Sequence, residues 1–256
     1  MTVHAAREGS VFTVVIDRPE RRNAVDDVTA VRLREAFHAF EADDQAQVAV
    51  LTGAGGYFCA GYDLKAFSER GATYDPEGEG PMGPTRRLLS KPVIAAVEGA
   101  AVAGGLELAL WCDLRVASTS AVFGVFCRRW GVPLIDGGTV RLPRLIGHSR
   151  ALDMILTGRA VEADEALAIG LANRLCPESE ALATAQALAA EIARFPALCM
   201  RTDRRTSYDQ WGLDLPDALR LEAREGEAPV REGAREGAGR FAGGAGRGGS
   251  FGDTAD

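Results

Sequence analysis

Two glycine-rich segments and one glutamate carry the chemistry that the sequence suggests. The segments are Phe58-Cys-Ala-Gly-Tyr-Asp-Leu-Lys65 and Gly99-Ala-Ala-Val-Ala-Gly-Gly-Leu-Glu107, and each follows an apolar run that predicts a buried strand. Small residues let backbone N–H groups approach a ligand closely, and the second segment also opens a predicted helix, whose first N–H groups lack internal partners. Two such N–H groups that converge on one oxygen form an oxyanion hole, which suits the enolate formed from a thioester.

Glu107 stands three residues after Gly104, in the first turn of that helix. A carboxylate is favoured there by the helix dipole, which is the purely structural interpretation. The functional interpretation is general acid/base catalysis, because the same position puts the carboxylate beside the carbon α or β to an activated carbonyl. The dinucleotide-binding, P-loop, hydrolase-elbow and zinc-protease motifs are all absent from the sequence, so these rival chemistries are not indicated.

The elements that must position these residues are short strands that alternate with helices, a pattern typical of an α/β chain with a buried sheet. Strands are predicted at 10–17, 48–52, 92–97, 114–117 and 121–125, and turns at 131–139. Helices are predicted at 23–40 with Asn23 as the cap, then at 105–112, 149–156, 162–168 and 178–193. The polar, Gly- and Pro-rich stretch 68–85 is predicted to be a surface loop.

Beyond Pro196 the strand signal disappears, and the chain is predicted to be helical to about Glu225. Residues 226–256 alternate Arg and Glu among many glycines, and such a segment has too little apolar content to pack alone. We therefore expect a core over 1–195 that holds the site, and a helical C-terminal region over 196–256 whose tail is disordered or ordered only against a partner.

Composition excludes several classes of function. The chain has 256 residues with 29 basic and 36 acidic side chains, and its net charge of −7 argues against nucleic acid as a partner. No apolar run approaches the roughly 18 residues that span a bilayer, so no membrane partner is expected. Five widely spaced cysteines without a Cys-x-x-Cys pair predict no disulfide framework and no metal site, and together with the lack of a signal peptide they favour a cytoplasmic location.

A series of motifs resembles, in order and spacing, the crotonase (enoyl-CoA hydratase/isomerase) family over about residues 10–200. The motifs are Arg18-Pro-Glu-Arg-Arg-Asn-Ala24, Leu51-Thr-Gly53, Phe58-Cys-Ala-Gly-Tyr-Asp-Leu64, Lys91-Pro-Val-Ile-Ala-Ala-Val-Glu-Gly99, Ala103-Gly-Gly-Leu-Glu-Leu-Ala109, Cys112-Asp-Leu-Arg-Val-Ala117 and Gly137-Gly-Thr-Val-Arg-Leu-Pro-Arg-Leu-Ile-Gly147. The resemblance implies a spiral of ββα units with a helical C-terminal region. It also implies a homotrimer or a dimer of trimers that binds an acyl-CoA thioester, with no cofactor besides the coenzyme A of the substrate.

The resemblance assigns roles to individual residues. The oxyanion donors would be the backbone N–H groups of Tyr62 and Gly104, and Glu107 would be one of the two catalytic glutamates of the hydratases. The stretch along the coenzyme A would consist of Ala60, Gly61, Tyr62, Asp63, Leu64 and Lys65. Basic residues that could meet the phosphates are Arg21, Arg22, Lys65 and Lys91, each of which could equally be a solvated surface charge.

The second hydratase glutamate is missing. Counting along Phe123-Gly-Val-Phe-Cys127 puts Cys127 at its position, and a buried thiol is a poor acid/base group at neutral pH. A replacement is Asp136, because Asp136-Gly-Gly-Thr-Val-Arg-Leu-Pro143 resembles the turn that carries the catalytic aspartate of dienoyl-CoA isomerases. That branch has two residues between Thr and Arg, whereas only Val140 stands here, and Asp-Gly is also a common turn pair.

The number of catalytic carboxylates distinguishes the possible reactions. Adding water across a conjugated double bond works best with two carboxylates, whereas shifting a double bond needs only proton removal and return. The family favours an enoyl-CoA hydratase with Glu107 as acid/base. The alternatives are an enoyl- or dienoyl-CoA isomerase that uses Glu107 and Asp136, and a non-catalytic acyl-CoA-binding protein in which Cys127 marks the lost acid.

Overall fold

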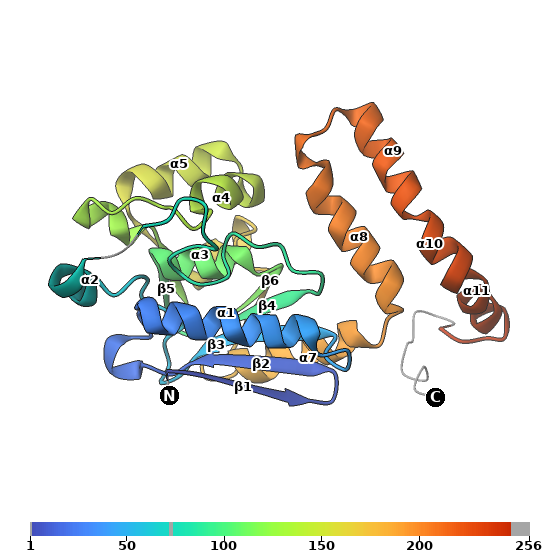
Figure 1. Cartoon of the computed structure of the whole chain (residues 1–256), viewed down its shortest axis with the longest axis horizontal. Coiled ribbons are helices and arrows are strands. Elements are labelled where there is room, and N and C mark those ends of the chain that lie inside the picture. Colours follow the sequence, from blue (N-terminus) through green and yellow to red (C-terminus); the bar gives the residue numbers. More distant parts are fainter. Residues whose placement is uncertain (1, 72–73, 247–256) are drawn as a thin grey trace.

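Two β-sheets lie at the centre of this computed structural model, which describes residues 2–71 and 74–246 (Figure 1). Among these residues the larger sheet has the strand order β1-β2-β3-β4-β6-β9 and the smaller the order β5-β7-β8. The strands are β1 (Val3–Glu8), β2 (Val11–Ile16), β3 (Val48–Gly53), β4 (Val93–Val97), β5 (Ala100–Val102), β6 (Leu114–Ser118), β7 (Val122–Gly124), β8 (Ala160–Glu162) and β9 (Arg174–Cys176). From β2 to β9 the larger sheet is parallel.

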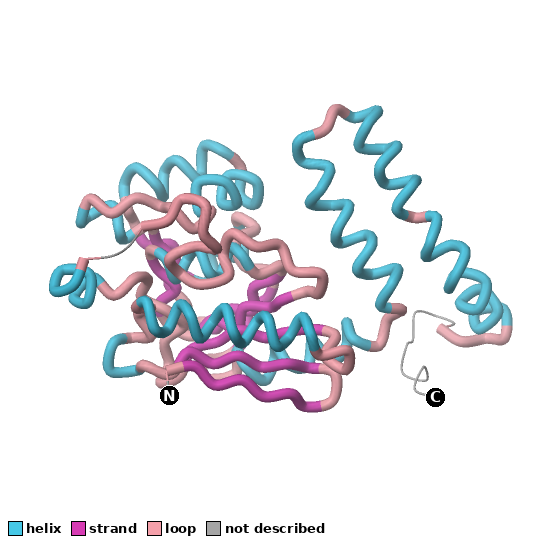
Figure 2. Tube along the Cα trace, in the orientation of Figure 1, coloured by secondary structure: helices cyan, strands magenta, loops and turns pink. Residues whose placement is uncertain are grey.

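Helices surround both sheets (Figure 2). They are α1 (Asp27–Ala42), α2 (Leu64–Arg70), α3 (Gly104–Trp111), α4 (Gly138–Ile146), α5 (His148–Thr157), α6 (Ala163–Ala168), α7 (Ala181–Ala193), α8 (Ala197–Asp209), α9 (Leu215–Glu225), α10 (Glu227–Pro229) and α11 (Arg235–Ala242). Shorter 3-10 turns are η1 (Pro19–Arg21), η2 (Phe126–Trp130) and η3 (Gln210–Gly212), and η4 (Val230–Ala234) is a π-helical turn.

The larger sheet is covered on both faces, as parallel sheets usually are. Successive residues of β3 point to opposite sides: Leu51 joins the core that includes Phe37 of α1, whereas Val50 joins the core that includes Leu188 of α7. Burial on both faces explains why β3 and β4 are continuous apolar runs, and it confirms the strands predicted at 48–52 and 92–97.

Six elements of the described core were not predicted from the sequence: the short strands β1, β5, β8 and β9 and the helices α2 and α4. Strand β1 pairs antiparallel with β2 at the sheet edge and buries only Val3, so its residues show no apolar alternation. Helix α4 lies largely beyond the predicted turns, in a segment where two glycines and Pro143 obscure the helical signal. The remaining strands and helices of the core lie at or within a few residues of the predicted positions.

The predicted cap of α1 was wrong. Asp26 caps the helix by accepting a hydrogen bond from the backbone N–H of Thr29 at 2.9 Å. Asn23 instead lies fully buried, and its side-chain amide donates to the carbonyl oxygens of Ala54 and Tyr57 at 2.8 and 2.6 Å. Asn23 therefore joins the loop after β2 to the loop after β3.

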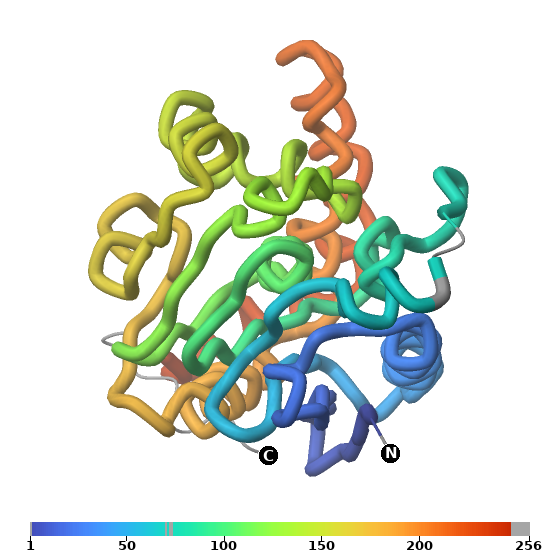
Figure 3. Tube along the Cα trace, turned by 90° about the vertical axis from the view of Figure 1, so that its left-hand side faces the viewer, coloured from blue at the N-terminus to red at the C-terminus, as the bar shows by residue number. Residues whose placement is uncertain are grey.

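The chain alternates between the two sheets as it proceeds. Strand β4 lies in the larger sheet, β5 in the smaller, and α3 follows; β6, β7 and η2 repeat this order. A parallel bridge joins Cys59 to Ala101, and Ala101 also pairs with Phe123. Three successive turns of the spiral are therefore aligned with one another. Figure 3, in which α1 is seen nearly end-on, shows these turns side by side. The predicted spiral of ββα units is confirmed.

The C-terminal helices form a hairpin in which α8 runs beside α9 and α10 (Figure 1). Asp113 attaches α8 to the core, because its Oδ1 accepts hydrogen bonds from Arg204 Nε and from the Tyr208 hydroxyl, both at 2.8 Å. Helical structure continues to Ala242, past the expected end near Glu225, and no residue of α9 to α11 is buried. The rest of the expected tail, 247–256, lies outside the described residues, and the domain boundary near 195 remains a prediction.

No helix in the described part of the chain is both long and apolar enough to cross a membrane.

Candidate active site

The two predicted oxyanion loops lie against each other. Gly61 has a φ of +98°, and a Cβ added there would lie 3.0 Å from the backbone nitrogen of Gly104. Ala103, the N-cap of α3, has a φ of +54° and a ψ of −125°, a conformation that non-glycine residues rarely adopt and that is typical of functional sites. The register of the spiral therefore places the loop that carries the Tyr62 N–H beside the first N–H groups of α3.

The paired glycines at the start of α3 have different neighbours. A Cβ at Gly105 would lie 2.0 Å from the carbonyl oxygen of Cys59, so only glycine lets α3 approach the neighbouring turn this closely. A Cβ at Gly104 would meet the side chain of Met82, 2.6 Å from its Sδ. Gly105 thus allows the start of α3 to pack against the backbone of Cys59. Gly104 leaves room for the side chain of Met82.

Glu107 projects from the first turn of α3 into a nearly closed environment, with 2% of its surface exposed. Its Oε1 accepts hydrogen bonds from the backbone N–H groups of Asp136 and Gly138, at 2.9 and 2.8 Å. Burial raises the pKa of Glu107 to about 7, and the charge of Asp136 contributes in the same direction. Such a carboxyl group exchanges a proton readily near neutral pH, as a general acid/base must.

Asp136 is the second buried carboxylate, also 2% exposed. Its Oδ1 accepts hydrogen bonds from the backbone N–H of Met82, at 3.0 Å, and from the hydroxyl of Thr85. Burial raises the pKa of Asp136, whereas these two bonds oppose the rise. The turn therefore buries Asp136 close enough to Glu107 for its charge to raise the pKa of Glu107. An Asp-Gly turn at the surface would leave this carboxylate exposed to solvent.

Met82 and Thr85 were not singled out from the sequence. They belong to the stretch 68–85, which was expected to be a surface loop; that expectation was wrong for its end, because Met82 and Thr85 are buried. No local pattern marks them, because their partner Asp136 is more than 50 positions away.

Cys127 lies in η2, the turn of the spiral after α3, and is 6% exposed. Burial raises the pKa of its thiol, and the neighbouring charge of Glu107 raises it further. The two arginines that follow bond to carbonyl oxygens at the end of α5: Arg128 to Ile155 at 3.0 Å and Arg129 to Gly158 at 3.0 Å. Cys127 is thus a buried thiol whose pKa lies above its ordinary value, which makes it a poor acid/base group.

The stretch from Ala60 to Lys65 has mixed environments. The Asp63 carboxylate is 3.1 Å from Arg18 and accepts hydrogen bonds from the first N–H groups of α2, so it serves the local structure. The Tyr62 hydroxyl donates to Asp27 at 2.6 Å. Leu64 and Lys65 are exposed, as are Arg21 and Arg22.

Lys91 was wrong as a candidate for the coenzyme A phosphates. Its side chain is 4% exposed, and its Nζ donates to the carbonyl oxygens of Phe40 and Asp43, at 2.9 and 2.7 Å. These carbonyls lie at the end of α1, where the helix leaves acceptors without internal partners. Lys91 is therefore a structural residue.

Known proteins resemble the chain over nearly its whole length. The family model described as enoyl-CoA hydratase/isomerase matches residues 6–243. Enoyl-CoA hydratase EchA19 of Mycobacterium tuberculosis is 36% identical over 248 residues, which cover 92% of this chain and 91% of that protein. Carnitinyl-CoA dehydratase of Proteus mirabilis is 39% identical over 202 residues, which cover 78% and 77%. The crystal structure of enoyl-CoA hydratase EchA1 from Mycobacterium marinum superposes with a TM-score of 0.89 at 36% identity, covering 94% of this chain and 96% of that one.

Proposed function

Because the chain belongs to the enoyl-CoA hydratase/isomerase family, we propose that it adds water to an enoyl-CoA thioester with Glu107 as the acid/base group. The observation that carries this proposal is the state of Glu107. It is a buried carboxyl group with a pKa raised to about 7, in the helix turn that follows the paired oxyanion loops. The homologous enzymes are hydratases and dehydratases of CoA thioesters by name, which agrees with lyase chemistry.

The proposed reaction uses three groups. The backbone N–H groups of Tyr62 and Gly104 donate to the thioester oxygen, and ionised Glu107 accepts a proton from a water molecule. As the water oxygen bonds to the β carbon, the π electrons of the double bond move toward the thioester oxygen, which becomes an enolate oxygen. The two N–H groups stabilise its charge, as dipoles fixed in a dry site do well. Glu107 then returns the proton to the α carbon, and the carbonyl re-forms.

The remaining assignments follow the family. The coenzyme A is proposed to lie along Ala60 to Lys65, with Arg21, Arg22 and Lys65 as the exposed cations available to its phosphates. A homotrimer or a dimer of trimers is proposed as the assembly. The cytoplasmic location and the absence of any cofactor besides the substrate's coenzyme A remain predictions.

A second candidate function is double-bond isomerisation by Glu107 and Asp136. Cys127 stands where the second hydratase glutamate is expected, whereas Asp136 is a buried carboxylate beside Glu107. One carboxylate would remove a proton from the α carbon, the electrons would spread into a dienolate, and the other would deliver a proton to the γ carbon.

The turnover of three thioesters separates the candidates. Crotonyl-CoA tests hydration through the loss of its conjugated absorbance, and a 3-enoyl-CoA and a dienoyl-CoA test isomerisation. The proposed function predicts that wild type consumes crotonyl-CoA, whereas the second candidate predicts turnover of the other two thioesters and its loss in Asp136→Asn. Calorimetric binding without turnover of any thioester would instead support the non-catalytic alternative and overturn both.

A further inference from the structure

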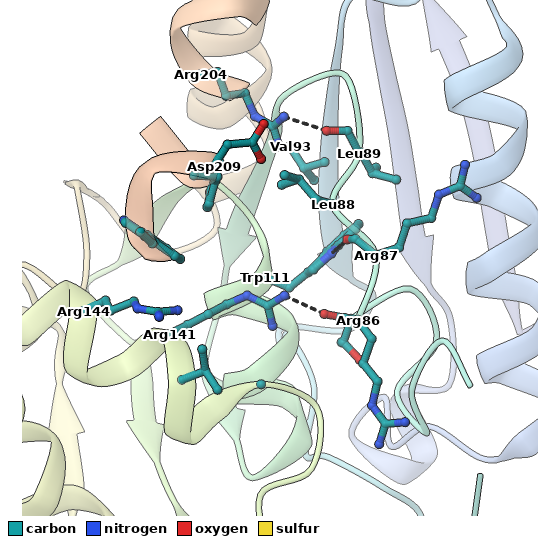
Figure 4. A pocket seen from close by; sticks show the side chains of 15 residues that line it. Arg86, Arg87, Leu88, Leu89, Val93, Trp111, Arg141, Arg144, Arg204 and Asp209 are labelled. Atoms are coloured by element: carbon teal, nitrogen blue, oxygen red, sulfur yellow. Dashed lines mark hydrogen bonds between the residues drawn. The ribbon is translucent and has the colours of Figure 1, made fainter. Parts of the chain in front are cut away.

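A cavity of about 370 Å³ lies between α4, residues 85–89 and the α8–η3 segment (Figure 4). Cavities of this size hold small organic molecules. Glu107, Tyr62 and Gly104 do not line it, so it is separate from the proposed site of proton transfer. Two lining residues contact Asp136: the Thr85 hydroxyl donates to its carboxylate, and Arg141 donates to its carbonyl oxygen.

Two cations of α4 line the cavity without a carboxylate partner in the described part of the chain. Arg141 donates to the carbonyl oxygens of Asp136 and Thr85, at 3.0 and 2.6 Å. Arg144, one turn later, stacks over the ring of Trp211 at 4.3 Å from its centre. Residues three apart lie on the same face of a helix, so the two positive charges are neighbours on one wall, as Figure 4 shows.

The other charged groups of the lining are already neutralised or directed elsewhere. Arg204 pairs with Asp113 at 2.8 Å, and Asp209 pairs with Arg205 at 2.7 Å. The Arg86 guanidinium donates to loop carbonyls, among them that of Ile135 at 3.0 Å, and Figure 4 shows it pointing away from Arg141. The buried carboxylates of Glu107 and Asp136 act on the charge of Arg141 from behind the wall, whereas Arg144 has no ion-pair partner among the described residues.

The remaining walls are apolar and aromatic. Trp111 donates its indole N–H to the carbonyl oxygen of Arg87 at 2.7 Å, which leaves its ring as lining. The Trp211 ring, over which Arg144 stacks, also lines the cavity, and Val93 and Val140 add to the apolar surface. A ligand that matches these walls carries one negative charge on a short apolar body.

We propose that this cavity binds a small organic carboxylate, with its charge at Arg141 and Arg144 and its apolar body against Trp111 and Trp211. Guanidinium groups bind carboxylates through charge-assisted hydrogen bonds, which are stronger than neutral ones. The aromatic rings desolvate the body of the ligand and strengthen those bonds. This site does not depend on which reaction the thioester site catalyses.

Calorimetric titration with hexanoate tests the proposal, with hexan-1-ol as the uncharged probe. Hexanoate is expected to bind wild type at least about tenfold more tightly than hexan-1-ol does, and Arg144→Gln is expected to weaken hexanoate binding by about tenfold or more. Arg144 is exposed, so the substitution leaves the core intact. Arg150→Gln removes the same charge from an exposed position of α5 outside the cavity, and it is expected to bind hexanoate like wild type.

Two further measurements locate the ligand. Saturation with butyryl-CoA is expected to leave hexanoate affinity unchanged, whereas displacement by butyryl-CoA would place hexanoate in the thioester site and overturn the proposal. In a Trp130→Phe background only the two cavity tryptophans remain, so hexanoate is expected to change the fluorescence. Absence of hexanoate binding, equal binding by Arg144→Gln, or equal affinity for hexan-1-ol would also overturn it.

Discussion

Replacing Glu107 with glutamine is expected to stabilise the protein above neutral pH, because the wild-type carboxylate ionises in a buried site. Its pKa in the folded protein is about 7, against 4.5 for the free side chain. Since the folded-state pKa is the higher, the native protein binds the proton more tightly than the unfolded chain. This contribution to stability is fully present below about pH 4.5 and is lost as the pH rises through 7.

The magnitude follows from the size of the shift. Each pKa unit corresponds to about 1.4 kcal/mol, so ionised Glu107 lowers the free energy of unfolding by about 3 kcal/mol above pH 7. Glutamine keeps a carbonyl oxygen that can accept the hydrogen bonds from Asp136 and Gly138 now held by Oε1. The substitution therefore removes the cost of the charge without leaving those N–H groups unpaired.

Urea unfolding between about pH 5 and pH 9 measures this effect. The Glu107→Gln protein is expected to exceed wild type by about 2–3 kcal/mol at the alkaline end, with the difference shrinking toward pH 5. Glu178→Gln, at an exposed position, serves as the matched control and is expected to show no such dependence. A Glu107→Gln protein that gains no stability between pH 5 and pH 9 would refute the account of the buried carboxyl group.

Three other substitutions test the surroundings of the site. Gly105→Ala is expected to lower the free energy of unfolding by at least about 1–3 kcal/mol and to reduce turnover, because the new Cβ would lie 2.0 Å from the carbonyl oxygen of Cys59. Scanning calorimetry measures the loss of stability, and initial rates measure the loss of turnover. Thr85→Val is expected to slow turnover about tenfold if Asp136 takes part, with Thr85→Ser near wild type, because the hydroxyl bond to Asp136 is lost. Lys91→Met is expected to destabilise the protein by about 2 kcal/mol in urea unfolding and to leave the KM for the CoA thioester unchanged, because its buried Nζ donates to carbonyl oxygens at the end of α1.

The sequence was most informative where function depends on local spacing. The interval from Gly104 to Glu107 is one helical turn, so the glycine motif alone placed the oxyanion loop and the acid on the same end of α3. The apolar runs Val48–Leu51 of β3 and Val93–Val97 of β4 were equally clear, because burial on both faces favours apolar residues at successive positions.

Features decided by distant contacts were not predictable. Thr85 binds Asp136 across 51 positions, and the side chain of Lys91 is buried against the carbonyl oxygens of a helix end 48 positions away. Asn23 has the residue type of a helix cap, yet tertiary bonds to the loop after β3 outweigh that local preference. In each case the deciding partner is remote in sequence and leaves no periodic signal.

The most direct test of the central claim is the initial rate of crotonyl-CoA hydration by Glu107→Gln, with crotonyl-CoA binding measured alongside by calorimetry. Removal of a general acid/base group slows a reaction by about 10²–10⁴-fold. The account predicts a loss of that size with the thioester still bound, because the N–H groups of Tyr62 and Gly104 are unchanged. Hydration at the wild-type rate by the Glu107→Gln protein would contradict it.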